Sequence, residues 1–131
     1  EATSLADFAG AKITGQLNTF HYTVIDQIPD VQKQTAMDTF PTMVVALTSG
    51  VIDGYISERP GAESAVATNP DLTYVEFADG QGFETDPADT SIAIGVAKGN
   101  TELLNAINGA LEELQADGTL QSIVDKYIKA E

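Results

Sequence analysis

Strand-like and helical patterns alternate along this 131-residue chain, and the alternation restricts its fold more than any other feature. Stretches rich in Val, Ile, Thr, Tyr and Phe predict β-strands. They lie at residues 11–17, 35–39, 51–56, 72–77 and 92–97. Because helical patterns separate most of these stretches, we expect crossover connections between parallel strands. The sequence therefore predicts an α/β fold in which helices cover both faces of a mostly parallel sheet.

Residues that start or stop helices mark the ends of the first helical patterns. A helix over residues 20–27 follows Asn18 and Thr19, which are both residue types that cap helix N-termini. Pro41 suits the first position of the next helix, and Gly50 suits the position just after its end. These local signals fix where each helix begins and ends.

Three more helices are predicted downstream. Glu58, followed by Arg59 and Pro60, opens the first of them, and Asn100 or Thr101 caps a long second one that stops at Asp117-Gly118. The third starts at Thr119 and carries apolar residues at helical spacing, namely Leu120, Ile123, Val124, Tyr127 and Ile128. Residues 79–89, which are rich in Gly and acidic residues, are predicted to form a loop.

The charge of the chain excludes several classes of partner. Its formal net charge is −14, and residues 1–91 carry 14 acidic side chains against Lys12, Lys33 and Arg59. Such a surface repels phosphates, so we expect no binding of nucleic acid and little affinity for anionic bilayers. No stretch reaches the roughly 20 apolar residues that a transmembrane helix needs.

The sequence offers no metal site, cofactor site or catalytic motif. Cysteine is absent, which excludes disulfides, thiolate metal sites and cysteine nucleophiles. His21 is the only histidine and is interpreted as an ordinary helix residue. The acidic residues of the 79–89 loop, Asp79, Glu84, Asp86 and Asp89, lack the alternating spacing of a calcium loop. No nucleophile elbow, Walker loop or dinucleotide fingerprint is present, so we expect a protein that is not an enzyme.

Ligands of parallel α/β sheets bind beyond the carboxyl ends of the strands. The residues to inspect are therefore those that follow each predicted strand, at 16–20, 39–42, 57–59 and 78–82. Among these, Gln16, Asn18 and Thr19 are polar, and Glu58 is the acid that follows the third strand.

Three segments of the chain resemble a known family. They are LADFAGAKITGQLNTF, ALTSGVIDGYISERPGA and IAIGVAKGNTELLNAINGALEELQADGTLQSIVDKY. The resemblance is to the solute-binding proteins of polar amino-acid ABC transporters, which have the type II periplasmic-binding-protein fold (bacterial extracellular solute-binding proteins, family 3). The third segment is the most specific, because its matched positions keep their spacing over 36 residues.

The resemblance implies a division of the chain into two parts. Residues 1–91 correspond to the second lobe of such a protein. Residues 92–131 correspond to the returning hinge strand and the C-terminal helices, which pack on the first lobe in the family. We expect that first lobe to lie outside this sequence, along with any leader or anchor. A fragment, a rearranged fold and a domain-exchanged homodimer are the alternatives left open.

The resemblance also implies two contacts with the backbone of an amino-acid ligand. In the family, a helix N-terminus receives the α-carboxylate, and the matching positions are Asn18, Thr19 and Phe20. The sequence departs from the family there, with Asn18 in place of the usual glycine and Phe20 in place of a small residue. Glu58 matches the acid that receives the α-ammonium, although aspartate is commoner. The alternative is that Thr19 only caps a helix and Glu58 only favours a helix start.

Two further residues are candidate ligand contacts. Gln16 matches a position where the family often places a residue that selects the ligand side chain. Arg59 could meet an acidic ligand side chain, although a surface ion pair is the stronger interpretation. Thr90 and Ser91 match the hinge and are interpreted as linker residues, and Asp53 is interpreted as structural.

The expected function is that of an extracytoplasmic receptor lobe. It would help to deliver a polar amino acid, such as arginine, lysine or glutamine, to the permease of an ABC importer. The alternatives are the sensing domain of a membrane receptor or kinase and, less strongly supported, a dehydratase-like enzyme of the same fold.

Overall fold

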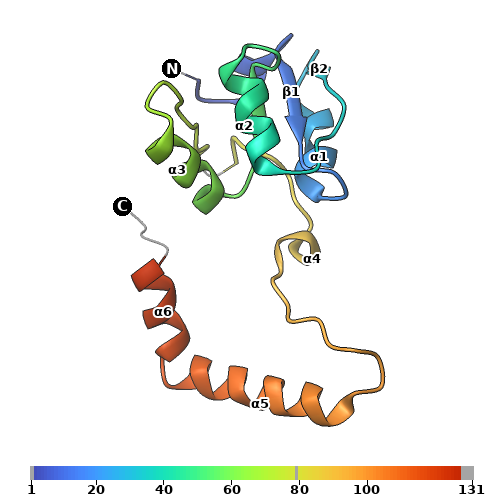
Figure 1. Ribbon diagram of the computed structural model, residues 1–131, viewed down its shortest axis with the longest axis vertical. Helices are drawn as coiled ribbons and strands as arrows, with labels where there is room; N and C mark the ends of the chain where they lie inside the picture. The colour runs from blue at the N-terminus through green and yellow to red at the C-terminus, as the bar shows by residue number, and fades with distance from the viewer. Residues whose placement is uncertain (1, 79, 128–131) are drawn as a thin grey trace. The chain divides into compact units, whose positions relative to one another are not determined.

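The computed structural model describes residues 2–78 and 80–127 (Figure 1). The chain divides into two compact units, Glu1–Thr90 and Ser91–Glu131, and each is described by itself. Two positions singled out in the sequence analysis, Asp79 and Ile128, lie outside the described residues.

A parallel sheet of three strands forms the centre of the first unit. The strands are β1 (Lys12–Gly15), β2 (Gln32–Lys33) and β3 (Gly54–Ile56), in the order β2-β1-β3. Both pairings of β1 are parallel, and Gly15 lies opposite Ile56. This confirms the predicted α/β architecture. The predicted strand at residues 35–39 is wrong in position, because the ladder lies at 32–33 and only Met37 adds a single bridge to Gln16.

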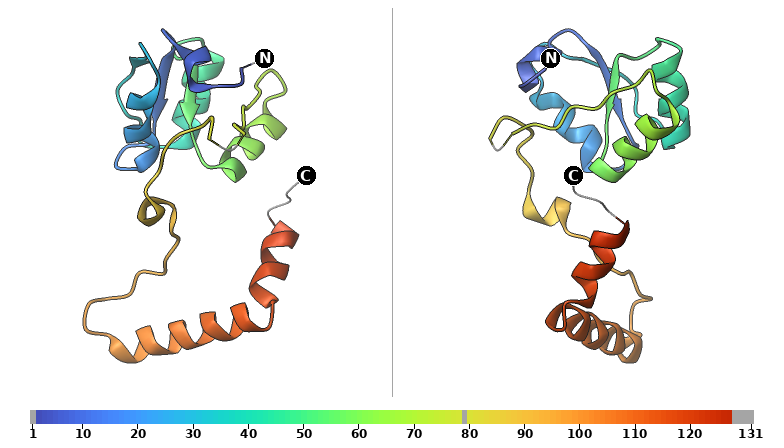
Figure 2. Two further views of the ribbon diagram at one scale, coloured as in Figure 1. Left: turned by 180° about the vertical axis from the view of Figure 1, so that it is seen from behind. Right: turned by 90° about the vertical axis from the view of Figure 1, so that its left-hand side faces the viewer.

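Helices lie on both faces of this sheet. The right-hand view in Figure 2 shows the strands between α1 on one side and α2 with α3 on the other. The helical elements of this unit are η1 (Leu5–Phe8), α1 (Phe20–Thr23), η2 (Val24–Gln27), α2 (Phe40–Thr48), α3 (Arg59–Thr68) and α4 (Pro87–Thr90). The predicted helix at 20–27 thus consists of one α-helical turn followed by one 3₁₀ turn.

Apolar side chains from both faces of the sheet form the core. Ile13 of β1 packs with Ile25 and Ile28, and all three are at most 3% exposed. Met43 of α2 and Ile52 before β3 are also buried. Full burial of one such side chain contributes roughly 1.5–3 kcal/mol. This core fixes the strands, and with them the loops that follow.

The predicted strand at residues 72–77 is wrong. Residues 72–78 have no regular secondary structure, and the side chains of Tyr74 and Val75 are exposed. A cavity of about 530 Å³ lies between this segment and the residues of β3 and α3. An apolar pattern becomes a strand only when its backbone reaches a partner strand, and here the cavity separates the two.

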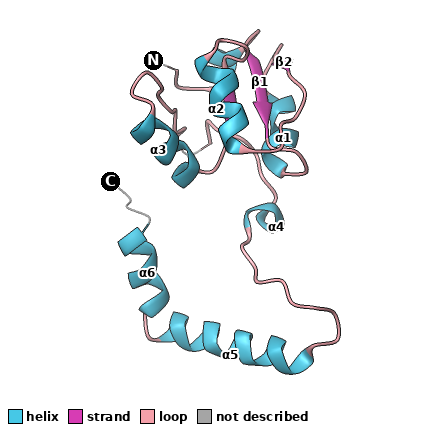
Figure 3. Cartoon of the chain, in the orientation of Figure 1, coloured by secondary structure: helices cyan, strands magenta, loops and turns pink. Residues whose placement is uncertain are grey.

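The predicted strand at residues 92–97 is also wrong. Figure 3 draws the whole stretch between α4 and α5 as loop. Ile92 is fully exposed and Ile94 is 56% exposed, so neither side chain belongs to a core among the described residues. The sequence pattern is strand-like, but the pairing that completes a strand is not made.

The second unit contains two helices. They are α5 (Thr101–Ala116) and α6 (Thr119–Tyr127). The Asn100 side chain caps α5 by accepting a hydrogen bond from the backbone N–H of Leu103 at 3.2 Å. Gly118 adopts a φ of 79° between the helices, a conformation that glycine tolerates best. Neither helix buries a described residue, and no described helix combines the length and apolarity of a membrane span.

Candidate functional site

Two loops leave the sheet side by side at the carboxyl ends of β1 and β3. The two strands are adjacent and parallel, and their last residues, Gly15 and Ile56, are paired. The loop that begins at Gln16 and the loop that begins at Ser57 therefore start from the same edge. This is the edge at which open parallel sheets bind ligands.

The absence of a side chain at Gly15 lets α1 lie close to the end of β1. A Cβ atom at this position would lie 3.0 Å from both the Cα and the backbone nitrogen of Tyr22. Contacts this short to backbone atoms are not relieved by rotating a side chain. Gly15 thus sets how closely the start of α1 approaches the strand edge.

Hydrogen bonds hold the loop after β1 in a tight turn. Gln16 Nε2 donates to the backbone oxygen of Asp38 at 3.0 Å, and Thr19 Oγ1 donates to the backbone oxygen of Gln16 at 2.8 Å. Asn18 adopts a φ of 61°, in the left-handed region that asparagine enters more easily than most residues. Thr19 is the N-cap of α1, but its hydroxyl does not cap the helix. Its hydroxyl closes the turn instead.

A shallow hollow of about 420 Å³ borders this turn. Asn18, Thr19 and Phe20 line it together with Asp89, so three of the six predicted site residues share one surface. Since α1 is four residues long, its aligned peptide dipoles are those of a single turn. The predicted carboxylate contact therefore has less support from a helix dipole than the sequence pattern indicates.

Glu58 occupies the start of α3 without using its carboxylate to cap the helix. It is the N-cap by backbone conformation, with φ −67° and ψ 153°, and makes no side-chain cap hydrogen bond. Ser57 Oγ donates to its backbone oxygen at 2.7 Å. The Glu58 side chain is 54% exposed, and its Oε2 lies 3.5 Å from Nε2 of His21. A partly solvated carboxylate of this kind suits contact with a cation.

The contact between His21 and Glu58 joins α1 to the start of α3 and was not predicted from the sequence. The His21 side chain is only 12% exposed, and its Nδ1 is buried without a hydrogen-bond partner. The Phe20 and His21 rings lie 4.1 Å apart at an angle of 31°. Burial lowers the pKa of His21 below 6.5, and the negative charge of Glu58 offsets part of that decrease. The sequence feature that could have indicated this contact is that His21 and Glu58 follow two strands that are adjacent in the sheet.

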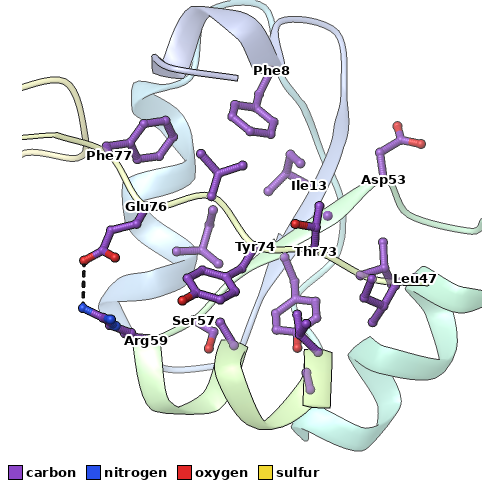
Figure 4. Close-up of a pocket in the computed structure, with 18 of the residues that line it drawn as sticks. Phe8, Ile13, Leu47, Asp53, Ser57, Arg59, Thr73, Tyr74, Glu76 and Phe77 are labelled. Carbon is purple, nitrogen blue, oxygen red and sulfur yellow. Dashed lines mark hydrogen bonds and ion pairs between the residues drawn. The ribbon is translucent and has the colours of Figure 1, made fainter. Parts of the chain in front are cut away.

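Arg59 points to a different part of the surface. Its Nε donates to Glu63 Oε1 at 2.7 Å and its Nη1 to Glu76 Oε1 at 3.3 Å. Figure 4 marks the second contact with a dashed line. The hydrogen bond to Glu63 and the charge of Glu76 raise the pKa of Arg59. These contacts form a surface ion-pair network that ties α3 to the segment after it.

A cavity beside Arg59 is mostly apolar. It is the space of about 530 Å³ between β3, α3 and residues 71–77, and aromatic residues that line it include Phe8, Tyr74, Phe77 and Phe83. Arg59 is the one predicted site residue among its lining residues. The structure therefore places Arg59 in one region, and the two strand-end loops in another.

Two other sequence interpretations concern structure and metals. Asp53 Oδ2 accepts a hydrogen bond from the backbone N–H of Lys12 at 2.8 Å, which gives Asp53 the structural role assigned to it. Within residues 2–78 and 80–127, no three His, Asp or Glu side chains gather as the ligands of a metal ion would.

Comparison with known proteins identifies a family. The model of the bacterial extracellular solute-binding proteins, family 3, matches residues 14–130. ABC transporter arginine-binding protein 1 of Escherichia coli (strain K12) is 32% identical over 127 residues, which cover 95% of this chain and 50% of that protein. The L-cystine-binding protein TcyJ of the same strain is 30% identical over 125 residues, covering 95% of this chain and 44% of that protein. The chain thus spans about half the length of these relatives.

A solved structure shares the fold. An ancestral arginine-binding protein bound to glutamine superposes with a TM-score of 0.72 at 30% sequence identity, covering 98% of this chain and 55% of that chain. The predicted periplasmic-binding-protein fold is thereby confirmed.

Proposed function

This chain belongs to the bacterial extracellular solute-binding proteins of family 3, and on that premise we propose that residues 1–91 form the second lobe of an amino-acid receptor. Residues 92–131 supply the returning hinge and the helices that pack on the first lobe. The receptor binds a polar amino acid, such as arginine, lysine or glutamine, outside the cytoplasm and presents it to an ABC permease. It binds its ligand without transforming it.

The observation that carries this proposal is the position of the Glu58 carboxylate. It stands at the carboxyl end of β3, is partly exposed and is not used to cap α3. The turn of Asn18, Thr19 and Phe20 follows the adjacent strand. In the proposed receptor, Glu58 receives the α-ammonium and this turn receives the α-carboxylate. Gln16 contacts the ligand side chain, whereas Arg59 keeps its ion pairs with Glu63 and Glu76.

A thermal-shift screen of the twenty amino acids on the full-length gene product tests the proposal. A ligand at one hundred times its dissociation constant stabilises the folded state by about 2.7 kcal/mol, which is readily seen as a raised midpoint. Glu58→Gln should abolish the shift, whereas Glu112→Gln, the same change of charge in α5, should preserve it. A full shift in Glu58→Gln would remove Glu58 from the site.

The 131-residue chain by itself should bind amino acids weakly or not at all, because the first lobe contributes about half of the contacts. Calorimetry checks this. Micromolar affinity in the isolated chain would contradict the division of the site between two lobes.

A further inference from the structure

We propose that His21 couples ammonium binding at Glu58 to the release of a proton, so that ligand affinity rises with pH while this imidazole is losing its charge. The inference rests on the proposed function, since it takes Glu58 as the ammonium contact. It gives His21 a role as a positioning residue that acts through Glu58.

Geometry places the imidazole against the carboxylate and isolates it from other partners. Nε2 of His21 lies 3.5 Å from Glu58 Oε2, and the ring is nearly buried, beside Phe20. Because Nδ1 has no hydrogen-bond partner, a proton on Nδ1 would be a buried donor without an acceptor. In the neutral ring, the proton is therefore favoured on Nε2, which faces the carboxylate.

Glu58 is the charged group that interacts with His21, because the other charged side chains named here are paired elsewhere or do not affect it. From α3, Arg59 is directed to Glu63 and Glu76. On the side of α1, Lys33 pairs with Asp26 at 2.8 Å. Asp89 borders the hollow beside Phe20 but does not contribute to the pKa shift of His21, in which burial and Glu58 are the causes.

These facts fix the direction of the coupling. Burial opposes the imidazolium, and Glu58 compensates part of that cost. An ammonium that neutralises Glu58 removes the compensation and adds a like charge nearby. The bound state then holds the His21 proton less tightly than the free state, so binding releases a proton. Affinity consequently falls as the solution becomes more acidic, by at most about tenfold per pH unit for a single proton.

The first test needs no ligand. In the 131-residue chain His21 is the only histidine, so its ring protons give one unambiguous pair of NMR signals. In Glu58→Gln the pKa of His21 should fall below its wild-type value, because the compensating charge is gone. Glu63→Gln, which removes a carboxylate already paired with Arg59, should leave the His21 titration unchanged. Identical curves in wild type and Glu58→Gln would overturn the coupling.

The second test measures protons. Calorimetric titration of the full-length gene product with L-arginine, at the midpoint of the His21 titration found in the first test and in buffers of different ionisation enthalpy, should show proton release in wild type. His21→Gln places an amide nitrogen near the Nε2 position and cannot be protonated. Whatever its affinity at pH 8, it should show neither the proton release of wild type nor the loss of affinity that wild type shows across the His21 titration. Circular dichroism at each pH verifies that the variants are folded.

The outcomes separate this inference from the proposed function. If Glu58→Gln binds L-arginine as tightly as wild type, the ammonium assignment fails. If Glu58→Gln loses binding but His21→Gln keeps the wild-type pH dependence, the assignment stands and the proton coupling fails.

Discussion

Helices α2 and α5 were both located from the sequence, but among the described residues only α2 buries side chains. Helix α2 has nine residues and buries Met43 and Ala46, whereas the sixteen residues of α5 bury none. Both helices have a polar side chain at the N-cap that accepts a backbone hydrogen bond. The difference shows that residues close in the sequence decide whether a helix forms. Whether its side chains are buried depends on the other elements that pack against it.

The largest expected difference concerns truncation of apolar side chains. Ile25 is fully buried, so Ile25→Ala should lower the free energy of unfolding of the first unit by about 2–5 kcal/mol. Leu103 in α5 is 45% exposed, and Leu103→Ala should change the stability by less than about 0.5 kcal/mol. Urea denaturation followed by far-UV circular dichroism measures both. Similar losses would mean that α5 is packed in solution.

Glycine-to-alanine substitutions should change the stability in opposite directions in the two units. Gly15→Ala places a Cβ 3.0 Å from the backbone of Tyr22 and should cost about 1–3 kcal/mol. Gly109 lies inside α5 with open space around the position of a Cβ, so Gly109→Ala should stabilise the helix by about 0.5–1 kcal/mol. Amide hydrogen exchange resolves the two units separately. Tolerance of Gly15→Ala would show that α1 approaches β1 less closely than described.

The smallest difference between the two units is expected at the helix caps. Thr39→Ala and Asn100→Ala each remove a side-chain acceptor at a helix N-terminus and should cost about 1 kcal/mol. Thr39→Ala should reduce exchange protection throughout the first unit, because α2 contributes to its core. Asn100→Ala should reduce protection in α5 alone. Loss of protection in both units from either change would contradict the assignment of each cap to its own unit.

The same contrast explains which secondary structure could be predicted. The ends of α5 could be predicted from the residues around Asn100 and Gly118, because helix capping depends on residues only three or four positions apart. The predicted strands at 72–77 and 92–97 have an equally clear pattern. A strand, however, needs a distant backbone as its partner, and a pattern of side chains carries no information about whether that partner is within reach.

The candidate site, like the secondary structure, was predictable only in part. Parallel strand order is enough to place Gln16 and Glu58 at one edge, because the carboxyl ends of adjacent strands coincide. The contact of His21 with Glu58 was not predictable, since it depends on the close approach of α1 over Gly15. The ligand roles of Gln16, Asn18, Thr19, Phe20, Glu58 and Arg59 stay predictions until binding is measured.

The strand order β2-β1-β3 leaves β3 at an edge of the sheet, and that has a practical consequence for handling the protein. Edge strands recruit other strands and start aggregation. The formal charge of −14 keeps copies of the chain apart at low ionic strength, but at 0.1 M salt such repulsion is screened within about 10 Å. Concentrated stocks should therefore keep best in dilute buffer well above the isoelectric point, and association between copies should increase with ionic strength.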